Sequence, residues 1–289
     1  MLVCDIDGTI LDDRGTLPAP VRHAIRAIAA SGVDVVLATG RSPWSGVASI
    51  CDVLGLDGPQ ITMQGALLSV PATGEVHRLR TLAPALYRDA LRFADELGLD
   101  PIVALLEGHR AERLPEGSEV FTVPIAHDAT FRYGGGLERL IGDRPIRVFL
   151  PTGPERHRTV RRALANRFAG RASIVWSDAT GVEVLPQGTH KGEAIAWLAA
   201  SRGIALDAVA SVGDGANDVE MLWCTGRSAA MGTAPLEARV CADIIVPPAS
   251  ELGVLDAFAW FFPDLADEFD GRGSRGVAGA IGPGAHPAG

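Results

Sequence analysis

Residues 2–9 read LVCDIDGT, a short apolar run that ends in two aspartates, a glycine and a threonine. The run predicts a buried strand that stops at Asp5. Because residues two apart on an extended chain point the same way, the carboxylates of Asp5 and Asp7 can address one site beyond the strand. Open α/β sheets bind ligands in the crevice outside the carboxyl ends of their strands. The stretch therefore predicts a ligand site; a simple turn is the alternative, since Asp and Gly are common after strands.

Working outward from this stretch, apolar strands alternate with helices on both sides of a central insert. We expect strands at 2–4, 33–38, 60–63, 208–212, 228–231 and 244–246, and helices at 20–31, 45–54, 191–202 and 218–223. Near-continuous apolar strands between helices are typical of a parallel sheet covered on both faces. The expected fold class is therefore α/β, with a Rossmann-like parallel sheet core made of residues 1–78 and 188–270.

The insert, residues 79–187, has a different pattern. We expect helices at 83–97 and 155–168, and strands at 102–106, 120–123, 146–150, 173–176 and 182–185. The order helix-strand-strand occurs roughly twice and predicts an inserted α+β cap domain with an open sheet. Residues 78–187 carry 16 arginines against 14 acidic residues, whereas the rest of the chain carries 10 lysines and arginines against 21 acidic residues. The cap could therefore face an anionic ligand held over an acidic core.

The composition excludes several classes of protein. A net charge of −9 argues against a general nucleic-acid binder, and no apolar run is long enough for a membrane span. The acidic motif begins at residue 5 and leaves no room for a signal peptide, so we expect a cytoplasmic protein. The four cysteines are far apart, which argues against a disulfide framework or a zinc site. Residues 271–289 are rich in Gly, Ala and Pro and are expected to form a disordered tail.

A second acidic motif, GDGAND at residues 213–218, ends another expected strand. Asp214 would join Asp5 and Asp7 if the two strands are neighbours. Carboxylates from two strand ends would form an oxygen-rich site of the kind that Mg²⁺ prefers. The alternative is a glycine-rich turn in which Asn217 or Asp218 caps the next helix.

Two further segments carry groups that suit a phosphate. Thr39-Gly40 ends the expected strand 33–38, where a hydroxyl and exposed backbone N–H groups can hold phosphate oxygens, although Thr39 could equally be a helix cap. Lys191 begins an expected helix and is the only lysine of the chain. A point charge on a flexible stem suits bridging two anions, whereas arginine prefers planar pairing. A surface position is the usual alternative for a single lysine.

Together, the four elements resemble the motifs of the haloacid dehalogenase superfamily of phosphatases. Residues 5–9 (DIDGT) match the first motif, Thr39 the second, Lys191 the third and residues 213–218 the fourth. The sequences ATGR at 38–41 and GDGAND at 213–218 resemble the motifs of the Cof-type subfamily in particular. That subfamily carries its cap between the second and third motifs. The resemblance extends to about Phe262.

The resemblance implies a mechanism. Asp5 would attack phosphorus and form an aspartyl-phosphate, while Asp7 would protonate the leaving oxygen and then activate water. Mg²⁺ would be held by Asp5, the backbone carbonyl of Asp7 and Asp214, with Asp218 supporting the metal shell. The residues expected to contact the phosphoryl group are Thr39, Gly40, Lys191 and Asn217.

The implied function is that of a Mg²⁺-dependent phosphatase acting on a small phosphorylated metabolite, such as a sugar phosphate. A phosphotransferase or phosphomutase using the same intermediate is an alternative, and a non-catalytic phosphometabolite-binding regulator is another. One departure is Gln64-Gly65-Ala66, where such proteins commonly have Asn-Gly-Ala. We assign no role to Gln64, and the oligomeric state is left open.

Weaker features receive structural interpretations. His109 and Arg110 are placed in a loop between the first two strands of the cap, where they could reach a substrate but are more simply the polar residues of a hairpin. Trp176 and Trp197 are interpreted as core residues. The aromatic run at residues 258–262 predicts a final helix that packs on the core.

Overall fold

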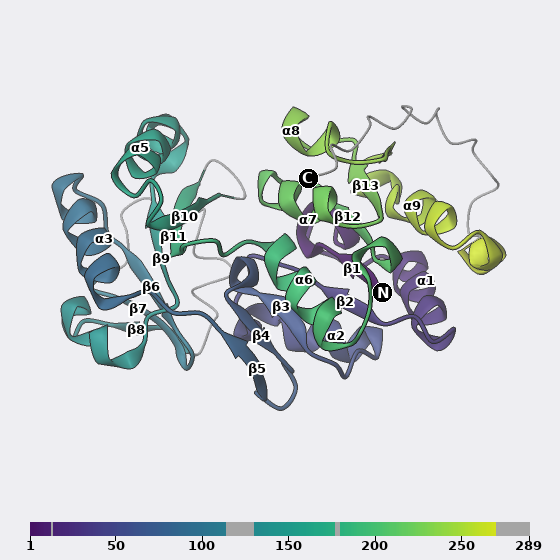
Figure 1. Ribbon diagram of the computed structural model, residues 1–289, viewed down its shortest axis with the longest axis horizontal. Coiled ribbons are helices and arrows are strands. Elements are labelled where there is room, and N and C mark those ends of the chain that lie inside the picture. Colours follow the sequence, from purple (N-terminus) through teal and green to yellow (C-terminus); the bar gives the residue numbers. More distant parts are fainter. Residues whose placement is uncertain (13, 114–129, 177–179, 270–289) are drawn as a thin grey trace.

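A five-stranded parallel sheet forms the centre of the core. The computed structural model describes residues 1–12, 14–113, 130–176 and 180–269 (Figure 1). The strand order is β14-β13-β12-β1-β2, and all neighbours are parallel. The strands are β1 (Leu2–Cys4), β2 (Val35–Leu37), β12 (Ala210–Gly213), β13 (Arg227–Met231) and β14 (Ile244–Val246). The parallel sheet expected from the sequence is confirmed.

Helices cover both faces of this sheet. Successive strand residues point to opposite sides, and the residues on both sides are apolar and pack against helices. Leu2 and Cys4 of β1 pack in one hydrophobic cluster, and Val3 packs in another. The first cluster contains residues of α1 (Ala19–Ala30), α2 (Ala48–Leu54) and α9 (Val254–Phe261). The second contains residues of α6 (Lys191–Ser201), α7 (Val219–Cys224) and α8 (Leu236–Arg239). The aromatic run at 258–262 therefore begins in a helix on the core, as expected.

A small antiparallel sheet lies beside the parallel one. It contains β3 (Gln60–Thr62), β4 (Leu67–Ser69) and β5 (Val76–Leu79), in that order. The strand expected at 60–63 is present, but it pairs antiparallel with β4 and is not part of the parallel sheet. Its link to the parallel sheet is a single bridge between Ala38 and Ile61. The short turn at Met63–Gly65 makes the antiparallel pairing possible.

The cap is built on a six-stranded sheet with the order β10-β11-β9-β6-β7-β8 (Figure 1). The strands are β6 (Ile102–Leu105), β7 (Gly108–Ala111), β8 (Arg132–Tyr133), β9 (Arg147–Pro151), β10 (Ala172–Val175) and β11 (Gly181–Pro186). Two helices, α3 (Pro84–Glu96) and α5 (Gly153–Arg167), pack their apolar faces on this sheet. The expected strand at 120–123 and the expected tail at 271–289 lie outside the described residues.

Several contacts join the cap to the core. A small buried cluster contains Met63, Ala66 and Leu67 of the core side together with Ala104, Ile146 and Leu185 of the cap. In addition, Arg80 donates to the carbonyl oxygens of Gln187 (2.6 Å) and Gly188 (3.0 Å), and so ties the two connecting segments together. The cap boundaries at 79 and 187 remain a prediction.

Three minor expectations were wrong. Trp176 is only partly buried, with the guanidinium of Arg161 4.1 Å from the centre of its ring, so it is not a core residue. His109 and Arg110 lie within β7, paired with Ala104 and Val103 of β6, because the hairpin turn comes earlier than expected. Trp197 is 37% exposed, and the guanidinium of Arg78 stacks over its ring, so this tryptophan lies on the surface of α6. Within the described part of the chain, no helix has both the length and the apolar character needed to cross a membrane.

Candidate active site

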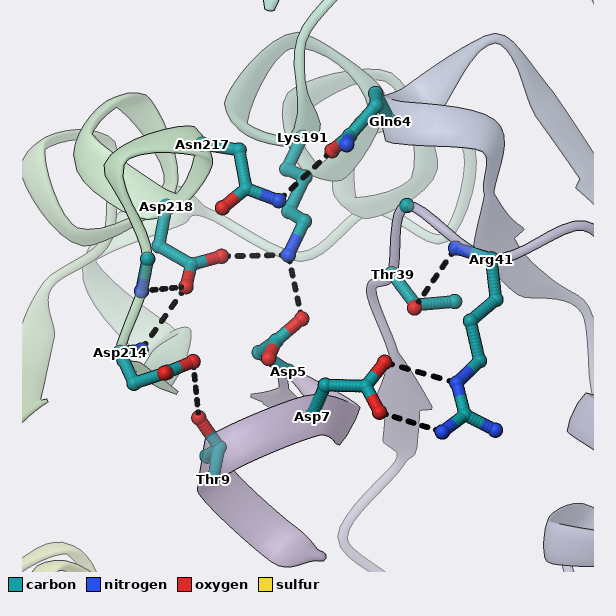
Figure 2. Close-up of polar contacts among 12 residues, drawn as sticks. Asp5, Asp7, Thr9, Thr39, Arg41, Gln64, Lys191, Asp214, Asn217 and Asp218 are labelled. Carbon is teal, nitrogen blue, oxygen red and sulfur yellow. Dashed lines mark hydrogen bonds and ion pairs between the residues drawn. The ribbon is translucent and has the colours of Figure 1, made fainter. Parts of the chain in front are cut away.

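The site lies where the carboxyl ends of three neighbouring strands meet, and Figure 2 shows its polar side chains. Asp5 follows β1, Asp214 follows β12, and Thr39 lies two residues beyond β2. The backbone N–H of Asp5 still donates to the carbonyl of Val212 at 3.0 Å, which holds the residue in line with the sheet. Parallel strands present their ends at one edge, so three remote segments deliver their polar side chains to one place.

Lys191 is the central cation of the site. It begins α6 and is completely buried. Its Nζ donates to Asp5 Oδ1 at 2.5 Å and to Asp218 Oδ1 at 2.6 Å. Burial alone lowers the pKa of Lys191, but the adjacent carboxylates of Asp218 and Asp5 outweigh it and raise the pKa. Lys191 therefore stays charged at neutral pH.

Asp218 organises the loop that carries Asp214. Its Oδ2 accepts hydrogen bonds from the backbone N–H groups of Asp214 (3.0 Å) and Gly215 (2.8 Å), while its Oδ1 faces Lys191. A Cβ at Gly213 would lie 2.5 Å from Asp218 Oδ2, so this close approach requires glycine. Both oxygens of Asp218 already accept hydrogen bonds. Its main role is therefore to position Lys191 and the loop that carries Asp214.

The acidic cluster fits a divalent cation. Ligand atoms of Asp5, Asp214 and Asp218 all lie within 4.8 Å of one another, and two of the three carboxylates already share one ammonium group. Burial, reinforced by the charge of Asp218, raises the pKa of Asp214 to about 7. Burial also raises the pKa of Asp5, against the opposing effect of Lys191. The cluster is short of positive charge, and oxygen ligands of this kind suit Mg²⁺.

Gly8 and Thr9 shape the space around Asp214. Gly8 has φ +69°, a conformation that favours glycine, and a Cβ there would lie 2.3 Å from Asp214 Oδ2. The Thr9 hydroxyl donates to Asp214 Oδ1 at 3.3 Å. The glycine of the first motif therefore leaves room for the carboxylate of Asp214 in the fourth motif, and the threonine donates a hydrogen bond to it.

Asp7 occupies a different environment from Asp5. Its side chain is 57% exposed and forms a two-point ion pair with Arg41, with Nε donating at 2.8 Å and a terminal nitrogen at 2.5 Å. Burial of Arg41 lowers its pKa, but the hydrogen bonds and charge of Asp7 reverse this and raise it. The Asp7 side chain thus lies with Arg41, outside the acidic cluster.

Thr39 and Gly40 form a turn against Gln64. The Thr39 hydroxyl oxygen accepts from the backbone N–H of Arg41 at 3.1 Å, and its side chain is buried. The amide of Asn217 donates to Gln64 Oε1 at 2.9 Å (Figure 2). The turn and the 213–218 loop therefore meet at Gln64.

The cap contributes charged groups at the edge of the site. Arg147 of β9 donates to the carbonyl of Gly40 at 2.7 Å and to the buried Glu183 of β11 at 2.5 Å. A cleft of about 480 Å³ opens beside Asp214. Its lining comes from the core (Asp214, Gly215, Ala216, Thr233, Pro235, Glu237) and from the cap (His157, Arg158, Arg161, Trp176).

The structure brings all the candidate residues from the four motifs to one edge of the sheet. The sequence did not assign roles to Arg41, Thr9, Gln64, Arg147 or Glu183. A signal existed for Glu183, because an acidic residue inside the apolar run 182–185 needs a buried partner. No comparable signal pointed to Arg147.

Similarity to known proteins extends over most of the chain. A family model described as haloacid dehalogenase-like hydrolase matches residues 2–258. The chain is 25% identical over 278 residues to phosphatase YwpJ of Bacillus subtilis, with 88% of this chain and 96% of that protein covered. It is also 25% identical over 273 residues to the chloroplastic endoribonuclease YBEY of Arabidopsis thaliana; that match covers 89% of this chain but only 45% of that protein's length.

Among solved structures, the sugar phosphatase BT4131, described as a member of HAD subclass IIB, shares the fold. The TM-score is 0.78 and the identity 24%, over 90% of this chain and 98% of that chain. The family model spans both halves of the parallel sheet and the cap between them.

Proposed function

The chain belongs to the haloacid dehalogenase-like hydrolases, and we propose that it is a Mg²⁺-dependent phosphatase of small phosphorylated metabolites, acting through an aspartyl-phosphate on Asp5. The observation that carries the proposal is the meeting of Asp5, Asp214 and Lys191 at one edge of the sheet. The similarity to phosphatase YwpJ supports the reaction class.

Asp5 is the proposed nucleophile. One of its oxygens is held by Lys191, which fixes the orientation of the carboxylate. An Asp5 oxygen forms a bond to phosphorus while the bond from phosphorus to the ester oxygen breaks. Water then attacks the phosphorus of the acyl phosphate, releases inorganic phosphate and restores the Asp5 carboxylate.

Asp7 is the proposed proton donor and acceptor. It gives a proton to the departing ester oxygen in the first step and takes one from the attacking water in the second. Arg41 holds the Asp7 carboxylate by two hydrogen bonds. These two contacts fix the orientation of the Asp7 carboxylate at the edge of the site.

Thr39, Gly40, Lys191 and Asn217 are the proposed phosphoryl-binding groups. The Thr39 hydroxyl oxygen accepts from Arg41, which leaves the hydroxyl proton to be donated to a phosphoryl oxygen. Lys191 already bridges two carboxylates and adds positive charge where the transferring group would develop negative charge. Asn217 would donate through its amide.

Asp5 and Asp214 are the side chains proposed to hold Mg²⁺, together with the backbone carbonyl of Asp7, while Asp218 keeps the loop in place. When bound, the ion supplies positive charge that offsets the clustered carboxylates and the phosphoryl oxygens.

The position of the cap supports the proposal that the substrate is small. Arg147 reaches the carbonyl of Gly40, so the cap lies directly over the phosphoryl-binding turn. The cleft of about 480 Å³ has room for a metabolite but not for a folded phosphoprotein. A cap that closes in this way excludes bulk water during the reaction.

The test is a panel of phosphorylated metabolites assayed with Mg²⁺, with Asp5→Asn as the blank. We expect turnover of at least one small phosphate ester, its loss on adding a chelator, and its loss in Asp5→Asn. Product analysis with and without an acceptor sugar would reveal phosphoryl transfer if that is the reaction. Undiminished activity of Asp5→Asn would contradict the proposed nucleophile.

A further inference from the structure

Gln64 lies in a strained turn between β3 and β4. It has φ +60° and follows Met63 with φ +49°, so two consecutive non-glycine residues adopt the left-handed region. Each such residue costs free energy and persists only where its surroundings hold it. The side chain of Gln64 is completely buried. A buried and strained residue at the edge of an active site is a candidate for a positioning role.

On the core side, Gln64 joins two of the phosphoryl-binding segments. Its backbone N–H donates to the carbonyl of Thr39 at 3.0 Å. Its side-chain Oε1 accepts from the amide of Asn217 at 2.9 Å, as Figure 2 shows. The orientation of the Asn217 side chain therefore depends on the position of the Gln64 amide.

On the cap side, the same amide reaches Glu183. Gln64 Nε2 donates to Glu183 Oε1 at 2.8 Å, and the other oxygen of Glu183 accepts from Arg147. A carboxylate only accepts hydrogen bonds, so the amide must turn its Nε2 toward Glu183 and its Oε1 toward Asn217. Glu183 is 5% exposed, which makes the contact a buried one between cap and core.

Gly40 leaves room for this amide. A Cβ at residue 40 would lie 2.4 Å from Gln64 Nε2 and 3.0 Å from its Cδ. Arg147 donates to the carbonyl of the same glycine. The amide is thus enclosed by the phosphoryl-binding turn on one side and by the buried ion pair of the cap on the other.

We propose that Gln64 is a positioning residue that couples the seating of the cap to the orientation of Asn217. When Glu183 docks, its carboxylate fixes the Gln64 amide, and the amide in turn fixes Asn217 for the phosphoryl group. The inference rests on the proposed function in one respect, since Asn217 is assigned there to the phosphoryl group. A glutamine suits this role because its side chain, one methylene longer than that of asparagine, reaches Asn217 and Glu183 together.

A reciprocal exchange tests the link between cap and core. Gln64→Glu keeps an oxygen for Asn217 but places a carboxylate against Glu183. We expect kcat/KM for p-nitrophenyl phosphate with Mg²⁺ to fall on the order of 10- to 100-fold. Adding Glu183→Gln reverses the contact, because the amide at 183 can now donate to the carboxylate at 64. The kcat/KM of the double variant should recover to within roughly fivefold of the original value. Failure of the second substitution to restore activity would overturn the coupling.

A second cycle tests whether Gln64 acts through Asn217. Gln64→Ala and Asn217→Ala should each weaken inorganic phosphate binding to the Mg²⁺-loaded protein, measured by calorimetry, and each should lower kcat/KM. If Gln64 works through Asn217, the double variant matches Asn217→Ala to within about threefold. Losses that multiply would show that the two residues act independently and would overturn the proposal.

Asp89→Asn is the matched control. Asp89 is also a 5% exposed carboxylate of the cap, and it pairs with Arg167 and Arg171. Its substitution should lower stability but leave kcat/KM and phosphate affinity unchanged; a loss of both equal to that of Gln64→Glu would point to general cap damage and count against the coupling. Failure of the proposed function is separate: it would appear as activity that survives in Asp5→Asn, whatever the Gln64 variants do.

Discussion

Two aspartates of the first motif, two residues apart, have different surroundings. Asp5 is buried beside Lys191, whereas the Asp7 side chain is 57% exposed and paired with Arg41. Environments that differ in this way let two carboxylates take different parts in one reaction. The buried, fixed carboxylate suits attack on phosphorus, and the exposed one suits exchange of protons with leaving group and water.

Asp7→Asn removes the proposed acid and base while keeping the shape of the side chain. We expect kcat to fall on the order of 10²- to 10⁴-fold, the usual contribution of a positioned proton-transfer group. The measurement is steady-state hydrolysis of a small phosphate ester with Mg²⁺. Asp57→Asn, at an exposed position, is the control and should keep full activity. A kcat unchanged in Asp7→Asn would remove Asp7 from the mechanism.

Gly8→Ala tests the close approach of the first motif to Asp214. Gly15→Ala is the matched control, because at Gly15 (φ +71°) a Cβ would have no atom within 4 Å, whereas at Gly8 (φ +69°) it would meet Asp214. Both variants should lose about 1–2 kcal/mol of stability from the left-handed backbone. Only Gly8→Ala should also lose Mg²⁺-dependent activity. Equal activity in the two variants would contradict the steric argument.

At the scale of elements, the loop 213–218 and the start of α6 form one unit. Asp218 accepts from Lys191 at one oxygen and from the backbone of residues 214 and 215 at the other. The first residue of the helix is therefore held to the end of β12 by a single side chain. Through Asp218, this arrangement fixes the position of Lys191 relative to Asp214.

Asp218→Ala leaves the buried Lys191 with one carboxylate fewer and two backbone N–H groups without their acceptor. Removing one partner of a buried ion pair typically costs about 3–5 kcal/mol, and we expect a loss of that order in urea unfolding. Asp218→Asn should cost less, because an amide oxygen can still accept from the backbone. A loss as small as that of the surface variant Asp207→Ala would show that the unit does not depend on Asp218.

At the scale of the whole molecule, the acidic cluster links stability to pH and to the metal. The folded protein holds Asp214 with a pKa of about 7, whereas an unfolded aspartate has a pKa near 4. The folded state therefore binds more protons than the unfolded state between these values. Without metal, the contribution of Asp214 to stability is largest below the unfolded pKa and is lost as the pH rises through about 7.

Mg²⁺ should therefore raise the melting temperature more at about pH 8 than at about pH 5, because protons compete for the same carboxylates at low pH. The measurement is thermal unfolding with Mg²⁺ and with chelator at both pH values. Asp214→Asn should reduce both the metal-free pH dependence and the Mg²⁺ effect. An equal Mg²⁺ shift at the two pH values would contradict this linkage.

Much of the core was predictable because its signals are local. The apolar runs before Asp5 and Asp214 predicted β1 and β12, and both strands are present within about two residues of the expected bounds. The antiparallel pairing of β3 with β4 was not predicted, since it depends on left-handed residues at Met63 and Gln64 that a propensity-based interpretation does not anticipate. His109 was misplaced for a similar reason, because the hairpin between β6 and β7 is short.

The sequence by itself determined the α/β class, the order of the four motifs and, to within about two residues, the positions of the five strands of the parallel sheet, because apolar periodicity and turn residues act over a few positions. Only the tertiary structure decided which side chains meet. Asp7 pairs with Arg41 across 34 positions, Gln64 with Glu183 across 119, and Lys191 with Asp5 across 186. Such partners are chosen by the packing of cap and sheet, since a hydrogen bond depends on distance in space and leaves no periodic trace along the chain.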